Sequence, residues 1–212
     1  MLADNLPDLT NLADAFAIPL SQYGLISLTG DESVKYLQGQ VTCDIESLPE
    51  KMLLNGAHCN AKGKVHSTFR LFSKNDTLLL MQSTASTNAS AAELKKFGVF
   101  SKVDIAIEEK YQLFGLAGSE IEALLNQYFT QLPDALSPVV HADNYSLLYL
   151  PGHSTQYVLV IENNDSHPIL GDEKLTQYAP AAWDLLEITN GIPTLHDSSV
   201  GEYVPQMLNV QA

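Results

Sequence analysis

The basic side chains in the first half of the sequence are the residues whose chemistry is easiest to state. Lys62 and Lys64 flank the glycine of the turn Asn60–Gly63, and Arg70 is the only arginine of the chain. Cations that cluster in a protein with a formal net charge of −14 favour an anionic ligand. Arg70 is the best candidate for a carboxylate, because a guanidinium can bind both carboxylate oxygens at once. An ordinary hairpin whose lysines keep it soluble is the alternative.

Charge is distributed unevenly along the chain. Up to residue 110 the sequence has ten basic and thirteen acidic residues, whereas the remainder has one lysine and twelve acidic residues. A surface that binds duplex nucleic acid is therefore not expected in the second half. From Lys62 to Lys102 seven basic residues accompany two acidic ones, so any anion site belongs there. The candidate cations are Lys62, Lys64, Arg70, Lys95, Lys96 and Lys102.

The histidines and cysteines lack the spacing of a reactive or metal-binding site. No pair among the six histidines has HxxxH or HxH spacing beside a third ligand, so no metal site is predicted. Cys43 and Cys59 show no CxxC spacing and are predicted to be buried, reduced thiols. The sequence contains no GxSxG, P-loop or GxGxxG motif, so nucleophilic and nucleotide-binding chemistry have no support.

Length and composition indicate a packed protein. A chain of 212 residues with 45% hydrophobic and 17% charged residues suits one large domain or two small ones. No apolar run approaches the roughly 18 residues that a membrane span needs. The first ten residues lack the basic and apolar regions of a secretory signal, so a cytoplasmic location is expected.

The elements that position these residues alternate between strands and helices. Gly63 can take the positive φ of a hairpin bend, and Gly98 is expected to end a helix. The pattern predicts an α+β fold with two antiparallel sheets, each covered on one face by helices. Residues 194–212 show no clear period and are expected to form an extended arm without its own core. Strands are expected over 25–29, 52–59, 64–72, 77–81, 99–107, 111–117, 145–150 and 157–161, and helices over 34–37, 86–97, 119–128, 172–178 and 181–189.

Four stretches in the same order resemble the YgfZ family, bacterial folate-binding proteins related to the T-protein of the glycine cleavage system. The stretches are LTGDESVKYLQGQVTCD, GAHCNAKGKVHSTFRLF, ELKKFGVFSKV and GIPTLHDSSVGEYVPQMLN. The resemblance implies two interleaved α+β domains, one formed by residues 1–50 with about 165–212 and the other by about 51–164. In the family a KGCYxGQE motif and a C-terminal β-barrel domain follow the last stretch, so we expect a truncated chain that lacks both.

The same resemblance implies a site for tetrahydrofolate or a folate derivative. Tyr23 and Trp183 are similar in position to two aromatic residues of the family's folate site, and stacking on a flat heterocycle gains about 0.5–1.5 kcal/mol. Sharing that site requires the last helices to return to the first strand. Trp183 has the alternative of being a core residue. Arg70, Lys62 and Lys102 are candidates for the glutamate tail of folate or for RNA phosphate.

Two functions and a scaffold role remain open. The family resemblance implies a folate-binding accessory protein that supports iron-sulfur enzymes, and through them tRNA modification; direct binding of tRNA stays open. The alternative is a folate-dependent aminomethyltransferase or one-carbon transfer enzyme of the T-protein type, which needs a carboxylate to steer proton movement. Ser67 and Thr68 stand where T-proteins carry Asp, and a hydroxyl is a poor general base, so no catalytic activity of that type is expected. The third interpretation is a ligand-free scaffold.

Overall fold

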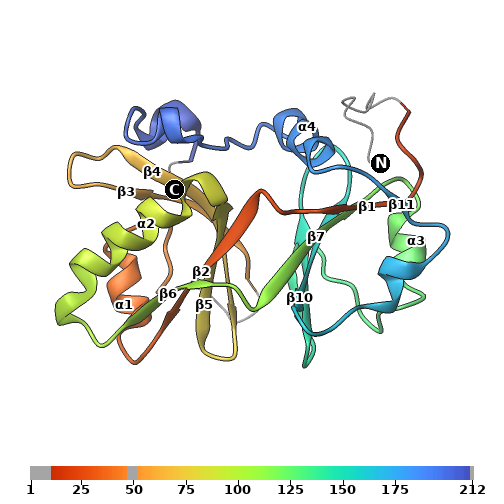
Figure 1. The fold of residues 1–212 in the computed structure, drawn as a ribbon, viewed down its shortest axis with the longest axis horizontal. Helices are drawn as coiled ribbons and strands as arrows, with labels where there is room; N and C mark the ends of the chain where they lie inside the picture. Colours follow the sequence, from red (N-terminus) through yellow and green to blue (C-terminus); the bar gives the residue numbers. More distant parts are fainter. Residues whose placement is uncertain (1–10, 47–51, 211–212) are drawn as a thin grey trace. The chain divides into compact units, whose positions relative to one another are not determined.

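The computed structural model describes residues 11–46 and 52–210, which fold into two compact units (Figure 1). Unit 1 consists of residues 1–21 and 110–192, and unit 2 of residues 22–109 and 193–212. Each unit therefore combines two separate stretches of sequence. The boundaries of the units differ from the predicted domain boundaries near residues 50 and 165.

Unit 2 is built on a five-stranded antiparallel sheet in the order β3-β4-β5-β2-β6. One face packs against the helices, where Ile26, Leu80 and Leu94 are buried in one core cluster. The strands are β2 (Tyr23–Thr29), β3 (Leu54–Cys59), β4 (Val65–Lys74), β5 (Thr77–Ser83) and β6 (Asp104–Glu108); the helices are α1 (Ser33–Gln38), α2 (Thr84–Phe97) and the 3-10 turn η2 (Gly98–Phe100). Helix α2 ends at Phe97 with Gly98 as its C-cap, as predicted, whereas residues 99 and 100, predicted as the start of a strand, lie in the turn η2.

The hairpin between β3 and β4 forms as the sequence predicts. Gly63 has φ 72°, and the Asn60 side chain accepts hydrogen bonds from the backbone N–H groups of Lys62 and Lys64 at 2.9 and 3.0 Å. The register shifts between His58 and Cys59. A β-bulge at this point bends the hairpin arm and redirects the side chains beside it.

Residues 193–210 pack on the same hairpin. The Val65 N–H donates to the Tyr203 carbonyl, and the Gly201 N–H donates to the Val65 carbonyl, both at 2.8 Å. Leu195 is buried against Val65 and Ala57. Two short 3-10 turns, η4 (Asp197–Ser199) and η5 (Pro205–Leu208), lie in this segment. The predicted arm thus obtains its core from the hairpin, because its own side chains are too widely spaced to form one.

Unit 1 is built on a six-stranded sheet in the order β11-β1-β7-β10-β9-β8. Strands β1 and β11 pair in parallel, and the other strand pairs of this sheet are antiparallel within the described residues. The strands are β1 (Phe16–Pro19), β7 (Tyr111–Ala117), β8 (Val139–His141), β9 (Tyr145–Leu150), β10 (Gln156–Glu162) and β11 (Thr176–Gln177); the helices are α3 (Ile121–Leu125), the 3-10 turn η3 (Pro168–Gly171) and α4 (Ala181–Thr189).

The predicted helix over residues 172–178 is wrong. The Thr176 and Tyr178 N–H groups donate to the carbonyls of Ala15 and Ala17, so this stretch extends the sheet instead. Pairing with β1 satisfies these backbone donors, which local helix propensity cannot anticipate. Across residues 11–46 and 52–210, no helix combines the length and apolar character of a membrane span.

Candidate functional site

Tyr23 and Arg70 lie on the same face of the unit 2 sheet. Arg70 is opposite Met81, Met81 is opposite Leu25, and Tyr23 begins the strand that contains Leu25. Side chains of directly paired residues point to the same face, and those two residues apart along a strand do so as well. The intervening Gly24 faces α2, since a Cβ there would lie 3.3 Å from Thr87 Oγ1. Tyr23 and Arg70 therefore share the face away from α2, two strands and roughly 10 Å apart.

Burial distinguishes Arg70 from the other candidate cations. Its side chain is 7% exposed, and Tyr23 is 9% exposed. Lys74, on the same face four residues along β4, is also buried at 5% exposure. Buried cations need polar or anionic neighbours to offset the loss of hydration. Sequence reasoning missed Lys74, although its even spacing from Arg70 and Phe72 in a strand was the signal.

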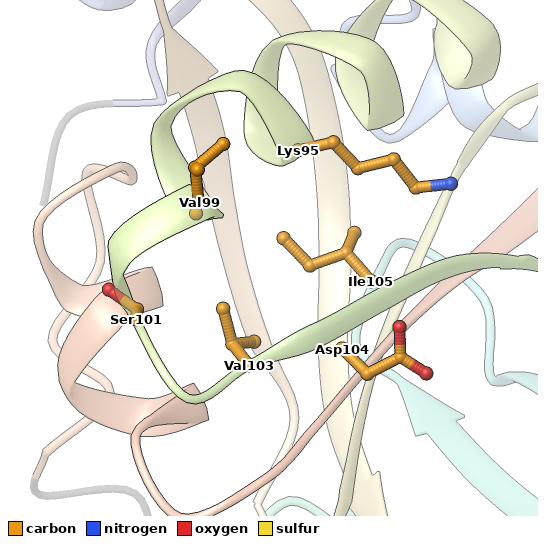
Figure 2. Close-up of a pocket in the computed structure, with 7 residues that line it drawn as sticks. Lys95, Val99, Ser101, Val103, Asp104 and Ile105 are labelled. Carbon is orange, nitrogen blue, oxygen red and sulfur yellow. The ribbon is translucent and has the colours of Figure 1, made fainter.

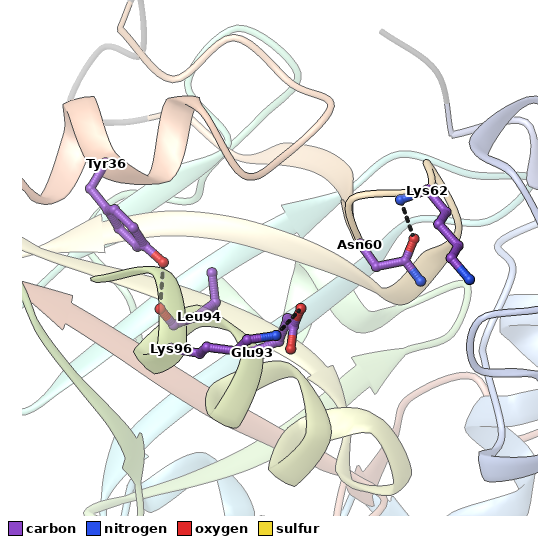
Figure 3. Close-up of polar contacts among 6 residues, drawn as sticks. All are labelled: Tyr36, Asn60, Lys62, Glu93, Leu94 and Lys96. Atoms are coloured by element: carbon purple, nitrogen blue, oxygen red, sulfur yellow. Dashed lines mark hydrogen bonds and ion pairs between the residues drawn. The ribbon is translucent and has the colours of Figure 1, made fainter. Parts of the chain in front are cut away.

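Lys62 and Lys102 lie at opposite ends of the sheet. Lys62 is exposed at the β3–β4 hairpin tip, where its backbone N–H binds Asn60 Oδ1 (Figure 3), and this tip is at the Tyr23 end. Lys102 is exposed and precedes β6, whose Asp104 pairs with Thr29 at the other end of β2. Seven residues of extended strand separate these ends by roughly 20 Å. The fold thus brings Tyr23 and Arg70 together, whereas Lys62, eight residues before Arg70 at the hairpin tip, lies roughly 20 Å from Arg70, and Lys102 lies at the other end of the sheet.

Trp183 is a core residue of unit 1. It lies in α4, is 0% exposed, and its ring covers Gly115 of β7: a Cβ added to Gly115 would lie 2.3 Å from both Cε3 and Cζ3. Only glycine permits so close an approach. The indole Nε1–H is buried and meets no hydrogen-bond acceptor in the described part of the chain. An unmet buried donor costs free energy.

The hydroxyls at the position of the T-protein carboxylates make structural contacts. Ser67 Oγ is 3.3 Å from Ser90 Oγ in α2, and Ser90 Oγ is 3.0 Å from His58 Nδ1. All three side chains are fully buried, so this network holds α2 on the sheet and is closed to a substrate. Thr68 Oγ1 donates to the Pro193 carbonyl at 2.8 Å.

The histidines of unit 2 form a close pair. The rings of His58 and His66 lie 5.6 Å apart, centroid to centroid, and burial together with the nearby His66 lowers the pKa of His58 to about 4. His58 is therefore neutral at pH 7. Within residues 11–46 and 52–210, no group of three or more His, Cys, Asp or Glu side chains is arranged to hold a metal ion.

Both cysteines are free thiols. Cys43 is buried, and burial raises the pKa of its thiol to about 11; Cys59 is half-buried, and burial raises its pKa as well. Thiols of this kind are protonated at pH 7 and react slowly. The prediction of buried, reduced thiols is confirmed for Cys43.

Sequence comparison connects this fold to known proteins. The tRNA-modifying protein YgfZ of Colwellia psychrerythraea is 48% identical over 207 residues, which cover 98% of this chain and 64% of the relative. This chain is similar to YgfZ proteins over nearly its whole length. The YgfZ protein of Yersinia enterocolitica is 38% identical over 199 residues, which cover 92% of this chain and 60% of the relative. The chain thus spans about three fifths of the length of these YgfZ relatives. No family model matches it.

A solved structure confirms the fold expected of a YgfZ protein. The glycine cleavage system aminomethyltransferase T from Bartonella henselae superposes with a TM-score of 0.77, at 17% sequence identity, over 91% of this chain and 55% of that protein. The predicted α+β architecture of antiparallel-rich sheets, similar to the T-protein, is therefore correct. At this level of identity the likeness concerns the fold and leaves activity to be argued from the residues.

Proposed function

We propose that this chain is the folate-binding part of an accessory protein that supports tRNA modification. The observation that carries the proposal is the position of Arg70. The only arginine of a strongly acidic chain lies almost buried on the same sheet face as Tyr23, in a fold of the T-protein type. Relatives named tRNA-modifying protein YgfZ support the second part of the proposal.

The residues of unit 2 fit the chemistry of tetrahydrofolate. Folate carries a flat heterocycle and a glutamate tail, and when bound it supplies a carrier for one-carbon groups. Arg70 would bind a tail carboxylate through two parallel N–H···O bonds. Tyr23 would pack against an aromatic ring of the ligand. Lys102 is not proposed for this role, because the length of β2 separates it from Tyr23.

We propose that the chain binds folate but does not catalyse one-carbon transfer. One-carbon transfer of the T-protein type requires a proton acceptor at the folate, whereas Ser67 and Thr68 bind Ser90 and the Pro193 carbonyl. We therefore propose that the chain binds folate without transforming it, and that the folate-bound chain acts on partner proteins. Iron-sulfur enzymes that modify tRNA are the proposed partners; the name of the relatives supports the tRNA part of this proposal.

Ligand titration of matched variants tests the folate proposal. Isothermal titration calorimetry follows binding of tetrahydrofolate and of a pterin that lacks the glutamate tail. Arg70→Lys keeps the charge but loses the two-point contact, so the affinity for the tailed ligand should fall roughly 10- to 100-fold while the tailless ligand is little affected. Lys174→Arg, an exposed change in unit 1, is the control.

Equal losses for both ligands would remove Arg70 from the folate site. Formation of a one-carbon product during the titration would instead favour the transferase. The role in tRNA modification is tested in bacterial cells that lack their own homologue: the wild-type gene should restore modified nucleosides, measured by mass spectrometry of tRNA, and the Arg70→Lys gene should restore fewer. If both genes restore the modified nucleosides equally, tRNA modification does not depend on the folate contact of Arg70.

A further inference from the structure

The surface formed by Lys95–Lys102, at the C-terminal end of α2, exposes apolar and basic side chains together; we call it the α2-end surface. Val99 and Phe100 of η2 are 71% and 100% exposed. Lys95, Lys96 and Lys102 are exposed around them. Among the residues that the structure describes, Phe100 is the most exposed large hydrophobic side chain. An aromatic ring wholly in water, next to other exposed apolar groups, marks a contact site.

Hydrogen bonds fix the backbone that presents Phe100. The Ser101 N–H donates to the Gly98 carbonyl at 3.0 Å, and the Lys102 N–H donates to Glu32 Oε2 at 2.7 Å. The Glu32 N–H donates back to the Lys102 carbonyl at 3.3 Å. Because this backbone is tied on both sides of Phe100, a ligand that contacts the ring would have little loop entropy to overcome.

A hollow of about 300 Å³ adjoins η2 (Figure 2). The view shows apolar side chains from the end of α2 and the start of β6 around the space, with the charged ends of Lys95 and Asp104 on the same side of it. Its volume is at the small end of ligand sites, which suits a single planar ring. The accessible lining of the hollow is more polar than apolar, which suits the polar edge of a nucleobase. The lining residues are Lys95, Val99, Ser101, Val103, Asp104 and Ile105, with Gly98.

Charge favours RNA over a protein as the ligand of this surface. The surface carries Lys95, Lys96 and Lys102, with Glu93 and Asp104 at its border, in a chain of net charge −14. Lys96 Nζ lies 4.9 Å from the Phe97 ring centroid and 3.7 Å from Glu93 Oε1 (Figure 3), which places a cation beside an exposed aromatic face. Bases stack on such faces while lysines contact the phosphates. The acidic second half of the chain opposes an extended duplex.

We propose that the α2-end surface binds a single-stranded segment of RNA, such as a loop of a tRNA. This inference builds on the proposed role in tRNA modification and gives that role a direct contact with the RNA. In the proposed complex one base stacks on Phe100, its neighbour enters the hollow, and Lys95 and Lys102 contact the intervening phosphates. The contacts are independent of the face that carries Arg70, because that face is turned away from α2.

Fluorescence anisotropy with a labelled tRNA anticodon stem-loop, compared with a fully paired duplex of the same length, tests the proposal. The wild-type protein should bind the stem-loop more tightly than the duplex. Phe100→Ala should weaken stem-loop binding roughly 5- to 100-fold, as expected for one lost base stack. Leu136→Ala is the matched control, because Leu136 is 90% exposed on unit 1 and its loss should leave the affinity unchanged.

The salt dependence of binding tests the phosphate contacts. Replacing Lys95 and Lys102 together by Ala should reduce the slope of log K against log salt by about 1.4, since each phosphate contact to a single strand contributes about 0.7. Lys174→Ala is the control, since this exposed lysine lies in unit 1. An unchanged slope would contradict the phosphate contacts.

Three outcomes would overturn the RNA surface. These are equal affinities of Phe100→Ala and Leu136→Ala, duplex bound as tightly as the stem-loop, and self-association of the wild type that Phe100→Ala abolishes in sedimentation. The last would assign the surface to contacts between copies of the chain. Titration of the wild type and of Phe100→Ala with tetrahydrofolate separates the two proposals. If both proteins bind folate normally and the wild type does not bind RNA, the RNA surface alone is refuted.

Discussion

Replacement of Trp183 gives the most direct test of the core of unit 1. Its side chain is 0% exposed, and complete burial of an aromatic side chain removes about 150–250 Å² from water. At about 25 cal/mol per Å² this corresponds to roughly 4–6 kcal/mol, close to the roughly 3–5 kcal/mol typical of Trp→Ala in cores. We therefore expect Trp183→Ala to lower the free energy of unfolding by roughly 3–5 kcal/mol, a large part of the stability of a typical domain. Urea unfolding followed by circular dichroism measures it, because the variant lacks the fluorophore.

Gly115 completes this test as a double-mutant cycle. A Cβ at position 115 would lie 2.3 Å from the Trp183 ring, so Gly115→Ala alone should cost roughly 1–3 kcal/mol through overpacking. With Trp183 also replaced, the new methyl group fills part of the vacated space, and the double variant should lose less than the sum of the single losses. Strict additivity would refute the contact. A Trp183→Ala protein with wild-type stability and lost folate affinity would refute the core assignment and make Trp183 a ligand contact.

Two further predictions concern unit 2. The pKa of His58 is about 4 in the folded protein, below the value of about 6.5 expected in the unfolded chain. The folded state therefore binds fewer protons than the unfolded state. The free energy of unfolding should be at its full value above about pH 6.5 and fall by up to roughly 3 kcal/mol as the pH drops through 4. Urea unfolding at pH 7 and 4.5 should show this loss, and His58→Gln should reduce it; the same pH dependence in both proteins would argue against His58. Gly63 has φ 72° and an added Cβ would meet nothing within 4 Å, so Gly63→Ala should cost about 1 kcal/mol of backbone strain. Gly171→Ala, also in open space but at a position without positive φ, should cost less by urea unfolding, and equal losses would contradict the explanation from strain.

Local sequence predicted the elements whose determinants are local. The β3–β4 hairpin follows from Asn60 and Gly63, because the side-chain cap and the positive φ lie within the turn itself. The short strand at Thr176 and Gln177 was missed, since both residues are exposed and become a strand only by pairing with β1, far away in the sequence. Such pairing overrides local propensity.

For the candidate site too, sequence predicted what depends on residue type and missed what depends on the packing of distant elements. Arg70 was identified by its residue type, and its burial follows from its place in β4. Lys102 was grouped with it by closeness in sequence, whereas the strand order puts Lys102 at the opposite end of β2 from Tyr23. The close approach of Trp183 to Gly115 could not be predicted, because it depends on where α4 packs relative to β7.

The position of β1 has a consequence for synthesis of the chain. This strand lies between β7 and β11, which both belong to the second half of the sequence. A growing chain emerges from the ribosome N-terminus first, so the apolar strand β1 is synthesised before β7 and β11 and stays unpaired until both have emerged. Pairing between distant segments is slow, and unpaired apolar strands aggregate. A translational pause before Tyr111 should therefore lower the yield of folded protein. A pause after Ile192 should not, because all strands of unit 1 have then been synthesised.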